Sequence, residues 1–104
     1  MTSESQTLLR KVMARYYVYT FISLKDRKFY TGFTGNLKRR LEEHTRGEVE
    51  STANRRPLLL VHYEYFINKD DARASEIFLK SGFSRKQLTA SLKRTLVDFQ
   101  SKLD

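Results

Sequence analysis

Five side chains in this sequence are of types that act together on phosphodiesters: two phenols, a guanidinium, an imidazole and a carboxylate. They are Tyr19, Tyr30, Arg40, His44 and Glu76. A phenol or an imidazole can activate a nucleophile, a guanidinium can stabilise a phosphate, and a carboxylate can bind a divalent metal ion. Each residue type is common, so their significance depends on whether the folded chain brings them together.

The chain is strongly basic, with 20 Lys and Arg residues against 12 Asp and Glu residues and a net charge of +8. Its pI is near 9.9. This balance favours a polyanionic partner, with nucleic acid the first expectation and an anionic membrane surface the second, although solubility alone is the plain alternative. A length of 104 residues fits a single domain with one core.

The composition also limits the chemistry and the location. The sequence holds no cysteine, which excludes disulfides and thiolate metal sites, so any metal must be held by His or carboxylate side chains. No apolar run approaches the roughly 20 residues of a membrane span. Residues 1–6 are polar and lead into no signal-type apolar segment. We therefore expect a cytoplasmic protein with no membrane contact.

Hydrophobic patterning predicts an α+β fold, in which a small, mainly antiparallel three-stranded sheet is flanked by helices. The predicted strands are 16–23, 28–33 and 58–66, and the first helix is 37–46. Asn36 is the expected N-cap of that helix, and Gly47 ends it. The nearly continuous apolar character of 58–66 is typical of a central strand. Residues 48–56 lack periodicity and are expected to form a loop.

Two further helices complete the predicted domain. The second helix is expected to be capped by Asn68, Asp70 or Asp71 and closed by Gly82. Ser84 is then an N-cap candidate for a terminal amphipathic helix, because apolar residues recur after it at three- and four-residue spacing. The predicted organisation is an N-terminal extension (1–14) with a short helical segment (8–13), a core (15–83) and a C-terminal helix of the same domain (84–104).

In the first helix, a rotation of about 100° per residue places Arg40 and His44 beside the apolar stripe of Leu37 and Leu41. Arg39 falls elsewhere. Arg40 is therefore the arginine aimed toward the sheet, where a fixed guanidinium is useful for binding phosphate. The alternative is that Arg40 only pairs with a carboxylate at the edge of the core.

In the second helix, Glu76 falls on the same side as the small residues Ala72 and Ser75, so its carboxylate is predicted to be half buried beside a pocket. A buried carboxylate needs a cation. That cation could be a metal ion, Arg40 across the site, or simply Lys80 one turn further along the helix.

On the first strand Tyr17, Tyr19 and Phe21 share one face, and on the second strand Tyr30 shares a face with Gly32. A register that sets Tyr19 opposite Gly32 or Tyr30 brings both phenols to one side of the sheet. A neighbouring arginine or metal ion lowers the pKa of a tyrosine, which helps a phenol to take part in proton transfer. Ordinary core packing is the alternative.

Together these residues resemble the GIY-YIG nuclease superfamily, in particular the short single-domain bacterial relatives of its UvrC and structure-specific-nuclease branch. The resemblance covers residues 15–83. Its motifs are Tyr17-Val18-Tyr19, Tyr30-Thr31-Gly32, Asn36 through Arg40-Leu41 to His44, Arg55-Arg56-Pro57, and Ala72 through Glu76 to Lys80. Tyr17 stands where the family has Gly and Thr31 where it has Ile. Both positions are chiefly structural in the family, and the replaced Gly is expected to reshape the pocket beside Tyr19.

The resemblance implies a phosphodiesterase that acts on DNA, including branched or damaged DNA in repair or recombination. It also implies one divalent metal, Mg²⁺ or Mn²⁺, bound through Glu76. In family terms Tyr19 or Tyr30 activates water, Arg40 steadies the transition-state phosphate, and His44 orients a tyrosine or a phosphate. Family relatives normally carry a separate DNA-binding or partner domain, so a protein partner is expected to supply specificity here.

Backbone phosphate contacts are expected from Lys38, Arg39, Arg55, Arg56, Arg85 and Lys86. Such contacts give salt-sensitive binding with little sequence preference, and solvated surface is the alternative for each residue. Two other functions compete with the nuclease. One is a non-catalytic nucleic-acid-binding module of the same fold. The other is a small basic RNA-associated protein in which Arg40, Glu76 and the tyrosines serve only the core and its ion pairs.

Overall fold

The computed structural model describes residues 5–6 and 15–103, with side chains up to Asp98. The predicted helical segment 8–13 lies outside the described residues. The strands are β1 (Tyr16–Ser23), β2 (Phe29–Thr34) and β3 (Leu58–Phe66). The helices are α2 (Leu37–Thr45), α3 (Glu50–Ala53), α4 (Lys69–Leu79), α5 (Gly82–Ser91) and α6 (Lys93–Leu103).

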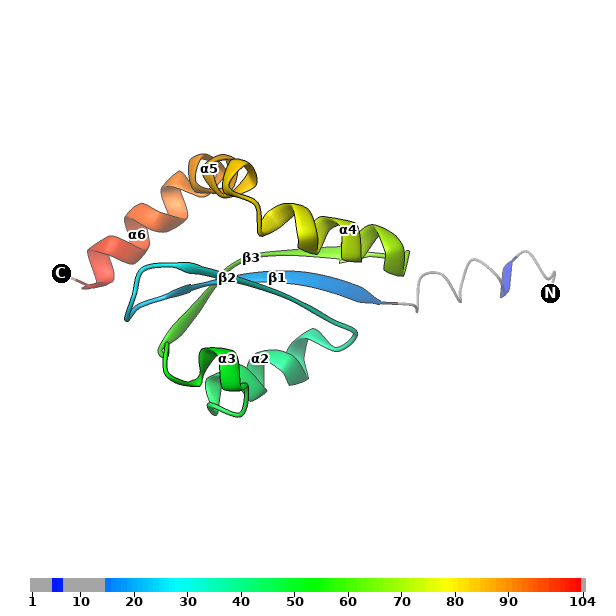
Figure 1. Cartoon of the computed structure of the whole chain (residues 1–104), viewed down its shortest axis with the longest axis horizontal. Coiled ribbons are helices and arrows are strands. Elements are labelled where there is room, and N and C mark those ends of the chain that lie inside the picture. Colours follow the sequence, from blue (N-terminus) through cyan, green and yellow to red (C-terminus); the bar gives the residue numbers. More distant parts are fainter. Residues whose placement is uncertain (1–4, 7–14, 104) are drawn as a thin grey trace.

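The three strands form one antiparallel sheet in the order β2-β1-β3, which confirms the predicted α+β fold (Figure 1). The prediction that 58–66 is the central strand was wrong, because β1 lies in the centre and β3 lies at an edge. Six of the eight residues of β1 are buried, whereas none of β3 is. The apolar run of β3 reflects partial burial rather than a central position.

Helices cover both faces of this sheet. Figure 1 shows α4 on one side of the strands and α2 with α3 on the other. On the α4 side, Val18 packs with Ala72 and Leu79 in the hydrophobic core. On the α2 side, the rings of Tyr19, Phe21 and Tyr30 pack against the imidazole of His44. Successive residues of β1 point to opposite faces, so a single strand contributes to both of these layers.

Side-chain caps determine where the helices begin. Asn36 and Asn68 accept backbone hydrogen bonds at the starts of α2 and α4, which confirms both as N-caps. The cap of α5 is Ser81 and not Ser84, which lies inside that helix. The prediction that Gly82 closes the second helix was also wrong, because α4 ends at Leu79 and Gly82 is the first residue of α5.

Two further predictions need correction. The segment 48–56 is not only a loop, because it contains α3, a single helical turn that buries Thr52 and is too short to produce a periodic signal. The terminal helix is not continuous, because the backbone leaves helical geometry at Leu92, between α5 and α6. Apolar spacing persists across that break and therefore conceals it. Within the described part of the chain, no helix is long and apolar enough to cross a membrane.

Candidate active site

The hydroxyl group of Tyr19 is at the centre of the candidate site. Tyr19 is 1% exposed and belongs to the central strand, which fixes the position of its ring. Its Oη lies 2.9 Å from Nε2 of His44 and 3.4 Å from Nε of Arg40. The two α2 residues predicted to face the sheet therefore converge on a single phenol.

The hydrogen bonding continues from His44 into α3. Nδ1 of His44 lies 2.7 Å from Oγ1 of Thr52, whose hydroxyl donates to the carbonyl of Val49 at 3.5 Å. All four contacts can be hydrogen bonds only when they run in one direction. Arg40 then donates to Tyr19, Tyr19 to Nε2 of His44, Nδ1 of His44 to Thr52, and Thr52 to the carbonyl of Val49. This direction assigns the Nδ1–H tautomer to neutral His44 and leaves its Nε2 as the acceptor for the hydroxyl of Tyr19.

The electrostatics of the site keep both proton-carrying groups neutral. Burial raises the pKa of Tyr19, and this effect is larger than the lowering of the pKa by the hydrogen bond from Arg40. The effect that the sequence predicted for a neighbouring arginine is therefore present, but the pKa is raised overall. Burial, followed by the positive charge of Arg40, lowers the pKa of His44 to about 4. At neutral pH the site therefore presents a protonated phenol, a neutral imidazole and a charged guanidinium.

Arg40 also has a second partner. Its Nη1 lies 3.1 Å from Oε1 of Glu43, one turn along α2, in a partly exposed ion pair. The alternative expected from the sequence, a carboxylate partner at the edge of the core, is therefore present beside the contact with Tyr19. The side chain of Arg40 is 37% exposed, so solvent can reach its guanidinium group.

Tyr30 belongs to the same side of the sheet. Its ring centroid is 5.4 Å from that of His44, and its hydroxyl accepts a hydrogen bond from Ser51 at 3.3 Å. Tyr19 lies opposite Gly32, two residues after Tyr30, so both phenols share one face as predicted. A side chain at Gly32 would overlap the hydroxyl of Tyr19. The glycine is therefore needed for the close approach of the phenol.

Glu76 comes from α4. Its carboxylate is 14% exposed and accepts hydrogen bonds from Nη1 of Arg73 and Nζ of Lys80, both at 3.1 Å. Lys80 is one of the three cations that the sequence allowed, and Arg73 is an additional one. The charge of Glu76 contributes to raising the pKa of Tyr19. This influence is electrostatic, because Glu76 comes from α4 and the partners of Tyr19 come from α2 on the other side of the sheet.

Glu76 is the residue that could hold a metal ion. Arg73 and Lys80 are about half exposed, and Arg73 also stacks on the ring of Phe33, 3.8 Å from its centroid. A metal ion at Glu76 would replace one or both of these cations. Mg²⁺ is commonly held by one or two carboxylates, with water and substrate phosphates completing its coordination. Among residues 5–6 and 15–103, no three His, Asp or Glu side chains converge on a common position. The donor set fits an ion shared between one carboxylate and a bound phosphate.

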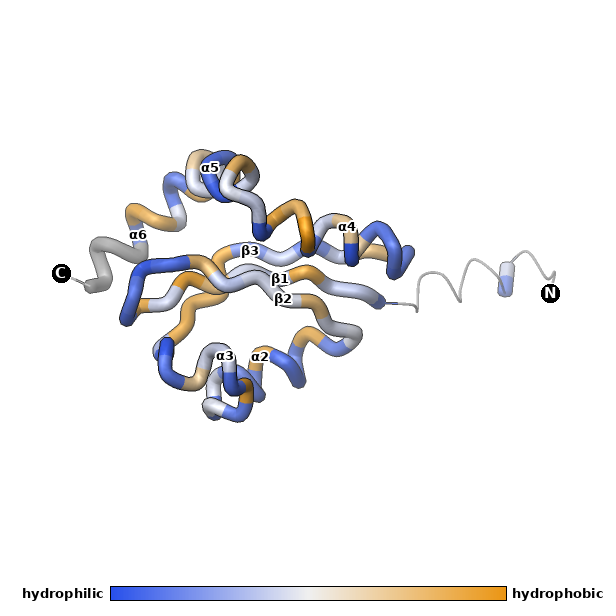
Figure 2. Tube along the Cα trace, in the orientation of Figure 1, coloured by the Kyte–Doolittle hydropathy of each residue, from blue (hydrophilic) through white to orange (hydrophobic). Residues whose placement is uncertain are grey.

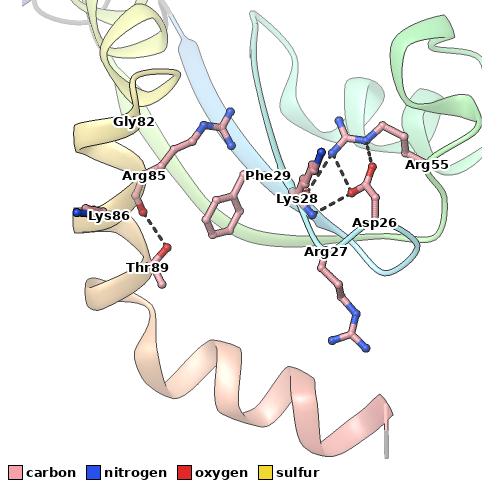
Figure 3. Close-up of a pocket in the computed structure, with 9 residues that line it drawn as sticks. All are labelled: Asp26, Arg27, Lys28, Phe29, Arg55, Gly82, Arg85, Lys86 and Thr89. Atoms are coloured by element: carbon pink, nitrogen blue, oxygen red, sulfur yellow. Dashed lines mark hydrogen bonds and ion pairs between the residues drawn. The ribbon is translucent and has the colours of Figure 1, made fainter.

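Three of the six predicted phosphate contacts line one pocket of about 740 Å³ between the β1–β2 turn and α5 (Figure 3). Arg55 comes from the segment before β3, and Arg85 and Lys86 come from α5. Arg27, Lys28 and Phe29 also line this basic pocket. Asp26 is the acidic residue that lines this pocket. Nε of Arg55 donates to its Oδ2 at 2.7 Å, and this hydrogen bond holds the pKa of the carboxyl well below its usual range. Cations therefore exceed carboxylates here.

The hydropathy of the backbone trace agrees with this location. The β1–β2 turn and the segment leading into β3 are among the hydrophilic parts of the molecule (Figure 2). The other predicted contacts lie elsewhere. Lys38 and Arg39 are exposed on α2. Arg56 donates to the carbonyls of Ala53 and Thr45, so it ties α3 to α2.

Three residues of the site were not anticipated from the sequence. Thr52 and Ser51 on α3 bond to His44 and Tyr30, and Arg73 pairs with Glu76. The only signal for Thr52 was chemical: a buried imidazole needs a partner for its second nitrogen. For Ser51 no pattern in the sequence could have indicated the contact.

The structure is a small α+β domain in which a tyrosine of the antiparallel three-stranded sheet meets an arginine and a histidine of α2 on one face. A family model described as the GIY-YIG catalytic domain matches residues 15–88. The chain belongs to the GIY-YIG family, whose domain is a nuclease fold.

The chain is also similar to curated proteins and to a solved structure. The UPF0213 protein SH2523 of Staphylococcus haemolyticus is 41% identical over 76 residues, covering 72% of this chain and 90% of the relative. The UPF0213 protein CPE1444 of Clostridium perfringens is 36% identical over 86 residues, covering 82% and 85%. The solution NMR structure of the UPF0213 protein BH0048 from Bacillus halodurans is 33% identical, covers 73% of this chain and 83% of that chain, and has a TM-score of 0.48.

Proposed function

We propose that this protein is a metal-dependent endonuclease that hydrolyses phosphodiester bonds in DNA. The observation that carries the proposal is the hydroxyl of Tyr19, held between Nε2 of His44 and Nε of Arg40 at 2.9 and 3.4 Å. A proton acceptor and a phosphate-binding cation thereby flank one hydroxyl group. The net charge of +8 supports a polyanionic substrate.

The proton of the attacking water moves through the buried pair. The water oxygen forms a bond to phosphorus as the bond to the 3′ oxygen breaks. The water gives its proton to Oη of Tyr19, and Tyr19 passes its own proton to Nε2 of His44. Thr52 supports this step, because its hydroxyl oxygen accepts the hydrogen bond from Nδ1–H of His44. His44 is thereby held in the tautomer whose Nε2 can accept a proton.

Arg40 stabilises the phosphate during the displacement. Its guanidinium carries charge at every working pH, and its partly exposed position lets it exchange Glu43 for an equatorial phosphate oxygen. Glu76 would hold the divalent cation in place of one or both of Arg73 and Lys80. When bound there, Mg²⁺ or Mn²⁺ supplies positive charge for the departing 3′ oxygen.

The basic pocket is suited to the backbone that flanks the scissile bond. Arg55, Arg85 and Lys86 offer phosphate contacts without base readout, which favours recognition of DNA shape over sequence. Branched or damaged DNA in repair or recombination fits this mode of contact. A protein partner then remains the source of further specificity.

The test is cleavage of labelled single-stranded, duplex, flap and four-way-junction DNA by the purified protein, with Mg²⁺ or Mn²⁺ against a chelator. The key variant is Glu76→Gln, which removes the charge and nearly preserves the shape. The matched control is Glu50→Gln, at an exposed carboxylate of α3. We expect metal-dependent cutting by the wild type and the control, and binding without cutting by Glu76→Gln.

Unchanged cutting by Glu76→Gln would remove Glu76 from the site. Salt-sensitive DNA binding with no cutting by any of the proteins would favour the non-catalytic binding module instead. Metal-independent binding restricted to RNA would favour the small RNA-associated protein.

A further inference from the structure

Three tyrosines form a cluster on the sheet that the candidate active site does not use. Tyr17 of β1 contacts Tyr63 and Tyr65 of β3, with ring centroids 6.3 and 5.5 Å apart. Tyr63 is 53% exposed and Tyr65 is 42% exposed. We call these three residues the tyrosine cluster. Large aromatic side chains that gather in the open, rather than in a core, point to an interaction surface.

The tyrosine cluster is continuous with the candidate active site. Tyr63 lies directly opposite Tyr19 in the β1–β3 register, and Tyr65 lies opposite Tyr17. Tyr17 and Tyr19 are two residues apart, so all four rings project from the same face of the sheet. The cluster therefore extends the face that carries Tyr19 toward the edge strand β3.

The surroundings of the cluster are cationic. A pocket of about 260 Å³ beside Tyr17 is lined by Arg15, Gly35, Asn36, Leu37 and Lys38, with no acid among these residues. Arg15 and Lys38 are both exposed. An apolar protein partner does not call for flanking cations, whereas a nucleic-acid strand presents bases for stacking and phosphates for the cations.

We propose that the tyrosine cluster stacks unpaired bases of a single-stranded segment adjoining the scissile phosphate, with Arg15 and Lys38 contacting the backbone. The substrate class is then nucleic acid with a single-stranded region. The inference rests on the proposed function, since it takes the Tyr19 face as the face that meets DNA. The bases are stacked in a sequence-tolerant way, because every base has an aromatic face.

The experiment measures binding without cleavage, in chelator and at low salt. The probes are a short single strand containing 2-aminopurine, whose fluorescence is quenched by stacking, and a duplex of the same sequence. The test variant is the double substitution Tyr63→Ala with Tyr65→Ala. Tyr63→Phe with Tyr65→Phe keeps the rings, and Phe83→Ala removes an exposed ring on α5 as a matched control. Circular dichroism checks that each variant folds.

We expect the alanine pair to weaken single-strand binding by roughly 10-fold or more and to abolish quenching, on the scale of base–aromatic stacking. The phenylalanine pair and the Phe83→Ala control should keep both, and duplex binding should change much less. Equal affinity of the folded alanine pair and the wild type would overturn the inference. So would an equal loss for the single strand and the duplex, or a wild type that fails to bind the single strand.

The outcomes are separable from those of the nuclease test. Loss of stacking is measured with no metal present, whereas the nuclease proposal stands on metal-dependent cutting and its loss in Glu76→Gln. A protein that cuts duplex DNA yet ignores single strands would retain the proposed function and lose this inference.

Discussion

At the scale of single residues, the position of Tyr19 decides what its phenol can do. A tyrosine with its ordinary pKa near 10 is a poor proton carrier at neutral pH. Burial raises the pKa of Tyr19 further, so a standing phenolate is not available. The neighbouring His44 is neutral and has Nε2 within 2.9 Å. The phenol can therefore act by passing a proton on rather than by losing one beforehand.

The adjacent arginines of α2 give a sharp test at this scale. We expect Arg40→Ala to lower kcat by more than roughly 100-fold, close to 3 kcal/mol, because one charge stabiliser at the phosphate is lost. Arg39→Ala is the matched control, since Arg39 is exposed one position earlier, and it should change KM without lowering kcat comparably. Steady-state cleavage of a labelled strand measures both constants. A change below 10-fold in kcat for Arg40→Ala would limit that residue to positioning.

At the scale of elements, β1 is the part of the fold that serves both purposes. One face of this strand packs Val18 against α4, and the other presents Tyr19 to α2. Because the side chains alternate, a one-residue shift in register would exchange the core and the site. The sheet therefore sets the position of the phenol more firmly than a loop would.

The partner strand supplies a prediction about this arrangement. We expect Gly32→Ala to destabilise the fold by roughly 1–3 kcal/mol, because the new methyl group overlaps the hydroxyl of Tyr19. Urea unfolding measures this loss. Gly82→Ala at the start of α5 is the matched control, since its methyl group meets no atom within 4 Å. Equal stability of Gly32→Ala and the wild type would mean that Tyr19 can withdraw from its position.

At the scale of the whole molecule, His44 links folding to pH. Its side chain is fully buried, and its pKa falls from 6.5 to about 4. As the pH falls below 6.5, the unfolded chain binds a proton at His44 while the folded chain does not. The free energy of unfolding is therefore highest above pH 6.5 and falls as the pH approaches 4. We expect the free energy of unfolding to fall by about 2 kcal/mol between pH 8 and pH 5.

Urea unfolding at several pH values measures this dependence, and two histidine variants isolate it. His62→Gln, at the partly exposed histidine of β3, should keep the fall in stability. His44→Gln should remove most of it, whatever its own stability at pH 8. A wild type with constant stability from pH 8 to pH 5 would contradict the assignment of a buried neutral imidazole.

Much of the fold was predictable from local chemistry. The alternation of β1 and β2, the N-caps Asn36 and Asn68, and the rotation that brings Arg40 and His44 to one side all follow from short-range geometry. The order of the strands did not follow, because an apolar run such as β3 can lie at an edge when a helix covers one face. The break at Leu92 was hidden because the apolar spacing continues across it.

The sequence by itself determined the residue types and the sides of the elements on which they lie, since the periods of strand and helix are local properties. It could not determine which groups become partners across the chain. The contacts of His44 with Thr52 and of Tyr63 with Tyr17 join separate elements, and so did not follow from any local pattern. Only the tertiary structure decided them, because burial and distance depend on how the helices close over the sheet.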